Sequence, residues 1–307
     1  MPSDKKEYMY STDALNWQES AISPLSPGAK IYIKGNKGKT TGLSLIPLPI
    51  GSSYSFKIGG NALTLLDYSG ILEDYDNACY QMFSSCRSIV DASQLYIDKV
   101  GESMCYYMFH DCSRLVTPPQ LPATTLAKLC YHDMFNGCTA LTQAPSLPAT
   151  NLADGCYYSM FYGCTSLTQV ELSATTLAKE CYANMFINCT SLTQVEVSAT
   201  ALAQECCRSM FHGCTSLTQA NLPATSLAYR CYYDMFSGCT SLTTISELPS
   251  TTLSDSCYEE MFINCSSLTT APLLPATNLA KSCYYSMFKG CTALTTAPSL
   301  PATTLAD

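Results

Sequence analysis

The dipeptide Met-Phe recurs nine times along this chain at an almost constant interval. Successive pairs are separated by 26, 26, 26, 25, 25, 25, 26 and 26 residues, and nine of the ten phenylalanines belong to them. The methionines of the pairs are Met82, Met108, Met134, Met160, Met185, Met210, Met235, Met261 and Met287. A fixed period of roughly 20–50 residues is typical of solenoids, in which each repeat packs only against its neighbours. We therefore expect a stack of nine coils instead of one or two globular domains.

Two hydrophobic periods follow one another within each coil, as residues 164–188 illustrate. Residues 167–172 read Leu-x-x-Val-x-Leu, which is the spacing of a short leucine-rich-repeat strand. After a polar turn, residues 177–186 carry the apolar pairs Leu-Ala, Cys-Tyr and Met-Phe at every fourth position. This pattern predicts an amphipathic α-helix of about three turns, with Thr176 as its N-cap.

A Gly or Asn follows seven of the nine predicted helices at an equivalent position. Both residue types adopt the left-handed backbone conformation at low cost, so this position predicts a helix C-cap. Its occupants are Gly137, Gly163, Asn188, Gly213, Gly238, Asn264 and Gly290. The predicted fold class is an α/β solenoid of nine 25–26-residue coils, each with a short parallel strand and a short helix. Because Pro interrupts the strands of several longer coils, we expect the most regular ladder at residues 167–222.

Residues 1–66 lack the repeat, and residues 67–307 carry it. Four strands are predicted in the first part, at residues 7–12, 30–34, 54–58 and 62–66. We expect them to form a small β-sandwich-like cap over the first coil, with Trp17 as its anchor. The last coil has no comparable cap. Its open end predicts either a longer array or self-association through the C-terminal coil.

Nineteen cysteines occupy repeated positions in the coils. Disulfides between neighbouring coils are conceivable, but parallel stacked side chains hold their Cβ atoms farther apart than a disulfide prefers, and the number is odd. A zinc site would need a close cluster such as C-x2-C, and the sequence has none. We favour reduced cysteines that pack as small buried hydrophobic side chains.

The charge distribution excludes several classes of protein. The net charge is −8, and only 13% of the residues are charged. Residues 1–66 contain seven lysines and four acidic residues, whereas residues 67–307 contain nine basic and twenty acidic residues. A nucleic-acid partner would need a basic stripe, so we expect none. No apolar run approaches the length of a membrane span, and residues 1–6 do not resemble a signal peptide.

The sequence also lacks a catalytic constellation. Histidine occurs three times, at His110, His132 and His212. His132 lies beside Asp133 and near Cys130, but the equivalent cysteines of other coils have no histidine, so we interpret it as a solvated variant. The adjacent carboxylates Glu259 and Glu260 are interpreted in the same way. We predict a non-enzymatic protein with no metal site and no cofactor.

The repeats resemble a known family. The segments MFYGCTSLTQVELSATTLA and MFNGCTALTQAPSLPAT, which begin at Met160 and Met134, are similar to the BspA-like leucine-rich repeats of bacterial surface proteins. The resemblance extends over about residues 75–307. It implies a leucine-rich-repeat fold and an adhesin that binds host or microbial targets, and it carries over no catalytic residue.

The residues that flank the inward Val of each strand are the candidate binding surface. They should project from the outer, concave side of the sheet, where solenoids usually bind partners. The candidates are Gln143, Gln169, Glu171, Gln194, Glu196, Gln219 and Asn221. We expect a protein or glycan ligand and a cell-surface or extracellular location. The alternatives are polar rows that only solubilise the sheet, and a virion-associated or cytoplasmic scaffold without a dedicated ligand.

Overall fold

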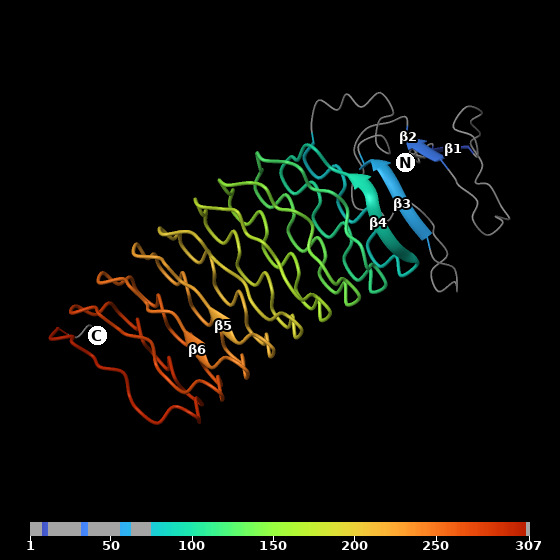
Figure 1. Ribbon diagram of the computed structural model, residues 1–307. Coiled ribbons are helices and arrows are strands. Elements are labelled where there is room, and N and C mark those ends of the chain that lie inside the picture. The colour runs from blue at the N-terminus through green and yellow to red at the C-terminus, as the bar shows by residue number, and fades with distance from the viewer. Residues whose placement is uncertain (1–7, 12–31, 36–55, 63–74, 305–307) are drawn as a thin grey trace, which may run out of the picture.

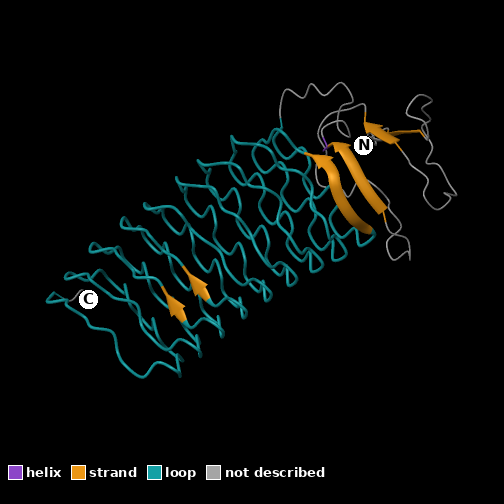
Figure 2. Ribbon diagram, in the orientation of Figure 1, coloured by secondary structure: helices purple, strands orange, loops and turns teal. Residues whose placement is uncertain are grey.

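The computed structural model describes residues 8–11, 32–35, 56–62 and 75–304, and the last of these ranges forms a stack of coils (Figure 1). The strands are short and few. They are β1 (Tyr8–Ser11), β2 (Tyr32–Gly35), β3 (Phe56–Asn61), β4 (Ile89–Tyr96), β5 (Gln219–Ala220) and β6 (Thr244–Ile245). Most of each coil consists of turns and loops (Figure 2).

The N-terminal strands form two separate pairs. β1 and β2 are antiparallel, whereas β3 pairs in parallel with β4, with register shifts on both sides of Lys57. β3 thus extends the strand side of the stack by one rung, although it belongs to the segment for which a cap was predicted. Trp17 and most of the predicted strand 62–66 lie outside the described residues. The sandwich-like cap and the boundary between residues 66 and 67 stay predictions.

Columns of identical side chains form the core, one member from each coil. All nine methionines of the Met-Phe pairs are buried, and so is every phenylalanine of the pairs except Phe288, which is half-buried. Successive phenylalanine rings stack from Phe83 to Phe288, with ring centroids 5.2–5.7 Å apart. Each offset-stacked pair stabilises the fold by about 0.5–1.5 kcal/mol beyond the burial of apolar area. The prediction that the repeat marks stacked coils with inward columns is confirmed.

The predicted α-helices are wrong. Within residues 75–304 no helix is present, and the segment expected to be helical is a run of consecutive four-residue turns. We call this segment the turn ribbon and define it by residues 129–138 and their equivalents in the other coils. Thr176 therefore caps no helix. It lies on the exposed surface, where it forms a parallel bridge with Asn151 of the preceding coil.

Backbone N–H groups of the turn ribbon alternate between two kinds of hydrogen bond. The N–H of Tyr131 donates to the carbonyl oxygen of Cys156 on the next coil, at 3.0 Å. The N–H of His132 donates to the carbonyl oxygen of Leu129 within the same coil, at 3.2 Å. The alternation continues along the ribbon and recurs in the other coils. The ribbon therefore provides a parallel hydrogen-bond ladder along the stack, which helices could not form.

Every fourth residue of the turn ribbon has a positive φ. In one coil these residues are Leu129 (55°), Asp133 (53°) and Gly137 (75°). The predicted left-handed position at Gly137 and its equivalents is thus confirmed, but it ends a turn ribbon instead of a helix. A non-glycine residue in this conformation costs about 1–2 kcal/mol, which the ladder hydrogen bonds must offset.

All nineteen cysteines are buried as free thiols, as predicted. The column that precedes the strands also has a polar role, because its thiols donate hydrogen bonds to the carbonyl oxygens of phenylalanines on the preceding coil. Cys164 and Cys214, for example, bond to Phe135 and Phe186 at 3.1 and 3.0 Å. A column of small apolar side chains therefore also satisfies buried backbone acceptors.

The strand side of the stack is less regular than the turn side. Within residues 167–222, where we predicted the most regular ladder, the coils are joined mainly by isolated parallel bridges such as Gln169 with Gln194. The longest strand is instead β4, at the N-terminal end. That prediction is wrong because the turn ribbon, and not the strand segment, supplies most of the hydrogen bonds between coils.

Candidate functional site

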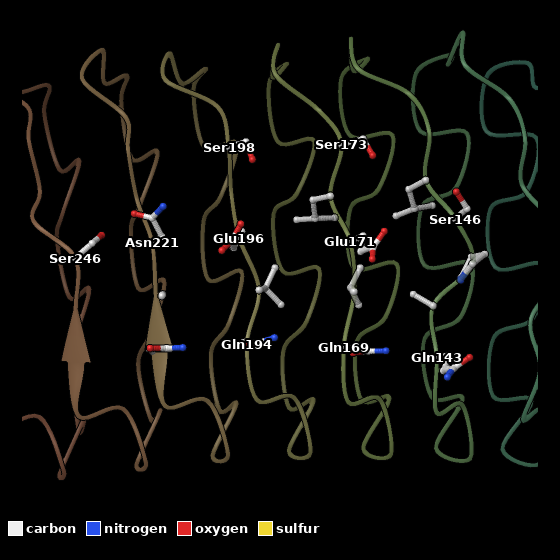
Figure 3. A pocket seen from close by; sticks show the side chains of 18 of the residues that line it. Gln143, Ser146, Gln169, Glu171, Ser173, Gln194, Glu196, Ser198, Asn221 and Ser246 are labelled. Atoms are coloured by element: carbon white, nitrogen blue, oxygen red, sulfur yellow. The ribbon is translucent and has the colours of Figure 1, made fainter.

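The seven candidate residues line one open groove on the strand side of the stack (Figure 3). The groove has a volume of about 850 Å³ and is formed by residues 143–147, 169–173, 194–196, 198, 219–221 and 244–246 of five successive coils. We call it the strand-face groove. Each of the seven side chains is exposed.

The strand segments place the groove side chains in rows because alternate residues point in opposite directions. In the coil of Gln169 and Glu171, these two residues face the groove, whereas Val170 between them is only 8% exposed and packs into the core. Neighbouring coils repeat this arrangement, so the glutamines form one row and the residues equivalent to Glu171 form a second.

Serines form a third row that the sequence analysis did not predict. Ser246 lies in the second row, beside Asn221, whereas Ser173 and Ser198 line the groove on the side opposite the glutamines. Their repeated position after the Leu-x-x-Val-x-Leu segment was a visible signal, but we interpreted it only as a polar turn. The groove thus presents amides, carboxylates and hydroxyls across its width.

A ladder of threonines fixes the glutamine row. The Oγ1 of Thr168 donates to the carbonyl oxygen of Thr142 at 3.3 Å, and the backbone N–H of Thr168 donates to the same oxygen at 3.3 Å. Similar pairs join Thr193 to Thr168 and Thr243 to Thr218. Because Thr142, Thr168, Thr193 and Thr218 each immediately precede a glutamine, these hydrogen bonds set the spacing between successive residues of the glutamine row.

The strand-face groove is negatively charged. Its charged side chains, within the described residues, are the carboxylates Glu171 and Glu196, and no Lys, Arg or His lines it. These two glutamates occupy equivalent positions on adjacent coils, where like charges destabilise each other. The groove can therefore accept hydrogen bonds at many points and would gain from a cationic group near its centre.

His132, which we interpreted as a solvated variant, is a half-buried member of an aromatic stack on the turn side. Its ring lies between those of Tyr106 and Tyr158, with centroid distances of 4.2 and 4.5 Å and interplanar angles of 8° and 11°. The His132 side chain is 13% exposed, and its Nδ1 lies 2.7 Å from Oδ2 of Asp133. The geometry of that contact is not that of a hydrogen bond. The solvated interpretation is wrong.

This stack extends along the turn side through a long-range contact. The guanidinium of Arg208 donates to the hydroxyl oxygen of Tyr158 at 3.0 Å, across the coil that contains Asn184. The amide of Asn184 donates to the same hydroxyl at 2.8 Å. Because the rings stack face to face, their edges and not their faces are available to a partner. The cluster therefore contributes to packing between coils.

The cluster of Ser209, His212 and Asp234 on the turn side lacks the connectivity of a catalytic triad. His212 Nδ1 and Ser209 Oγ lie 2.9 and 3.0 Å from the same oxygen of Asp234, so the serine donates to the carboxylate and not to the imidazole. A nucleophilic serine would need the opposite connectivity. Glu260 accepts a hydrogen bond from the Tyr233 hydroxyl at 2.8 Å, so it is not a simple solvated carboxylate.

The described part of the chain shows neither a cluster of metal ligands nor a membrane-spanning helix. No group of three or more His, Cys, Asp or Glu residues there has the geometry to hold a metal ion. No helix long and apolar enough to cross a membrane is found there. Burial also raises the pKa of the Cys130 and Cys214 thiols to about 12, which disfavours the thiolate needed for metal binding or nucleophilic attack.

Comparison with known proteins identifies the family. The model of the BspA type leucine rich repeat region matches in six copies, over residues 102–234, 130–268 and 208–303. The chain belongs to this family, whose repeats are typical of protein-interaction surfaces. A crystal structure of a leucine-rich repeat protein from Bacteroides ovatus matches with 18% sequence identity and a TM-score of 0.29, covering 70% of this chain and 68% of that one. No curated protein matches.

Proposed function

We propose that this protein is a non-enzymatic binding protein and that the strand-face groove holds its partner. The observation that carries the proposal is the convergence of the seven candidate side chains, all exposed, on one groove across five coils. A rigid array of this kind presents many weak polar contacts in fixed positions, which suits recognition of an extended surface.

The chemistry of the groove supports binding over catalysis. Its lining lacks a nucleophile paired with a base, and its two carboxylates are on adjacent coils at equivalent positions instead of facing each other across a cleft. Exposed amide and hydroxyl rows retain their hydration without a partner. A protein or a glycan with matching donors would replace that water.

A matched pair of glutamine substitutions tests the proposal. Wild-type protein is screened on arrays of proteins and glycans, and each ligand found is measured again with Gln194→Ala and Gln204→Ala. Gln194 lies in the groove and Gln204 is exposed near the turn ribbon. We expect only Gln194→Ala to weaken binding, by about three- to tenfold for loss of one or two hydrogen bonds. Equal effects of the two variants would reject the groove as the binding surface.

The setting proposed for this activity is the bacterial cell surface, as in adhesins. Support comes from the family to which the repeats belong. The alternative is a virion-associated or intracellular scaffold without a dedicated ligand, in which the C-terminal coil contacts a second copy. Surface biotinylation of cells that produce the native protein distinguishes the two locations. Light scattering of the purified chain over a range of concentrations tests the self-association.

A further inference from the structure

We propose that the strand-face groove takes a basic amphipathic α-helix, laid along the axis of the stack with about one helical turn over each coil. This inference rests on the proposed function and names the partner's chemistry. It is carried by three properties of the groove, which are its repeat distance, its width and its charge.

The repeat distance of the coils is close to the pitch of a helix. Phenylalanine centroids of successive coils are 5.5–5.7 Å apart in the core, and parallel bridges such as Gln169 with Gln194 place the groove rows about 4.8 Å apart. An α-helix advances about 5.4 Å per turn, so side chains at i, i+4, i+7 and i+11 stay within about 2 Å of equivalent positions over four coils. An extended peptide repeats its side chains on one face about every 6.7 Å and loses this register within a few coils.

The width of the groove also fits a helix. Gln169 and Ser173 stand on opposite sides of the groove and are four residues apart in the sequence. Extended chain advances about 3.3 Å per residue, which separates the two rows by about 13 Å. A helix with its side chains is about 10–12 Å across, so the glutamine and serine rows can contact its two sides.

The negative charge of the groove determines which side chains a bound helix should carry. Glu171 and Glu196 lie in the second row, between the glutamines and the serines, and no cationic side chain of the described residues lines the groove. Lysines or arginines along one face of the helix would relieve the repulsion between these carboxylates and donate to the amide oxygens of the glutamine row. An acidic helix would meet like charge, which provides specificity.

Synthetic helices test this inference directly. One peptide of about 18 residues, or five turns, carries lysines at i, i+4, i+7 and i+11 on one face of an Ala/Gln helix. A second has the same composition with the lysines distributed around the helix. We expect the first to bind about tenfold more tightly by fluorescence anisotropy and to gain helicity by circular dichroism on binding. Equal affinities of the two peptides would overturn the inference.

Matched charge variants locate the binding. The double variant Glu171→Gln/Glu196→Gln removes two charges from the groove, and Glu102→Gln/Glu180→Gln removes two charges elsewhere on the surface. Only the groove variant should weaken the one-face peptide, by about tenfold. Equal weakening by both variants overturns the helix inference. If neutral glycans from the array lose binding with Gln194→Ala while neither peptide binds, the helix inference fails and the proposed function stands.

Discussion

The thiol of Cys189 donates a hydrogen bond to the carbonyl oxygen of Phe161 on the preceding coil, at 3.1 Å. That oxygen also accepts the backbone N–H of Cys164 at 3.0 Å. The same contact recurs along the stack, so these cysteines combine the small volume of an apolar residue with one donor that a buried acceptor needs. Alanine would lack the donor, and valine would lack both the donor and the fit.

This burial predicts unreactive thiols. We expect the native protein to react with almost none of the iodoacetamide offered at neutral pH, whereas the unfolded protein reacts at all nineteen cysteines. Cys291, which at 8% is the most exposed of them, should react first. Mass spectrometry after timed labelling measures the order. Rapid labelling of a central thiol such as Cys189 would show that the stack opens far more readily than its packing indicates.

The inward columns could be predicted from the sequence, but the conformation that produces them could not. Residues 177–186 repeat their apolar pairs every four residues, and we assigned that spacing to an α-helix. A helix has 3.6 residues per turn, so side chains four apart drift by about 40° each time. Two columns that keep strict register over three repeats fit a run of four-residue turns better. The many polar residues at the position of Asn184 were a second signal for positive φ.

The candidate site, like the fold, could be predicted only in part from the sequence. Alternation along the strand placed Gln169 and Glu171 on the exposed side, because that rule depends only on local geometry. The third row, with Ser173, depends on how the chain leaves the strand and passes over the core. That path is a tertiary property, so the repeated serine indicated a polar turn but not its place at the edge of the groove.

Gly163 allows the cost of a left-handed backbone to be measured without a steric clash. Its φ is 69°, and a Cβ added there would meet nothing closer than the backbone N of Gly137 at 3.9 Å. We expect Gly163→Ala to lower the free energy of unfolding by about 1–2 kcal/mol and Gly163→Asn to lower it by less. Asn188 occupies the equivalent position at φ 58°, which supports this order. Urea denaturation measures both variants, and equal losses would contradict the backbone explanation.

Cys207 interrupts the buried tyrosine column, and filling this position should stabilise the stack. Equivalent positions on the two neighbouring coils hold the buried residues Tyr182 and Tyr232. Cys207→Tyr would add two ring contacts, each worth about 0.5–1.5 kcal/mol, and should raise the melting temperature. Cys206→Tyr is the matched control, because that column holds cysteine in the neighbouring coils and a larger side chain overpacks it. A lower melting temperature for both variants would mean that neighbouring side chains already fill the space.

Hydrogen exchange should distinguish the two sides of the stack. N–H groups of the turn ribbon, such as that of Tyr131, bond to the next coil, whereas in the described structure no backbone hydrogen bond joins residues 170–173 to residues 195–198. We expect the ribbon amides to exchange at least about tenfold more slowly, or about 1.4 kcal/mol in opening free energy. Exchange measured by nuclear magnetic resonance resolves single residues. Similar protection of both sides would show that the strand side is held as firmly as the ribbon.

The contact between His212 and Asp234 joins adjacent coils and makes stability depend on pH. The hydrogen bond from the imidazole to Asp234, at 2.9 Å, raises the pKa of His212, and partial burial opposes this effect. A folded-state pKa above the unfolded value means that protonated His212 stabilises the fold, so the contribution is complete below the ordinary pKa of about 6.5 and is lost as the pH rises through the folded pKa. Other groups also titrate in this range, and the contribution of His212 is isolated by substitution.

We therefore expect His212→Gln to lower the melting temperature more at about pH 5.5 than at pH 8. His110→Gln is the control, because His110 Nδ1 lies 3.4 Å from Asp111 of its own coil and joins no second coil through that contact. Differential scanning calorimetry of the three proteins at both pH values measures the effect. A loss for His212→Gln that is independent of pH would mean that the imidazole acts only by packing, and the proposed ionic link between the coils would be wrong.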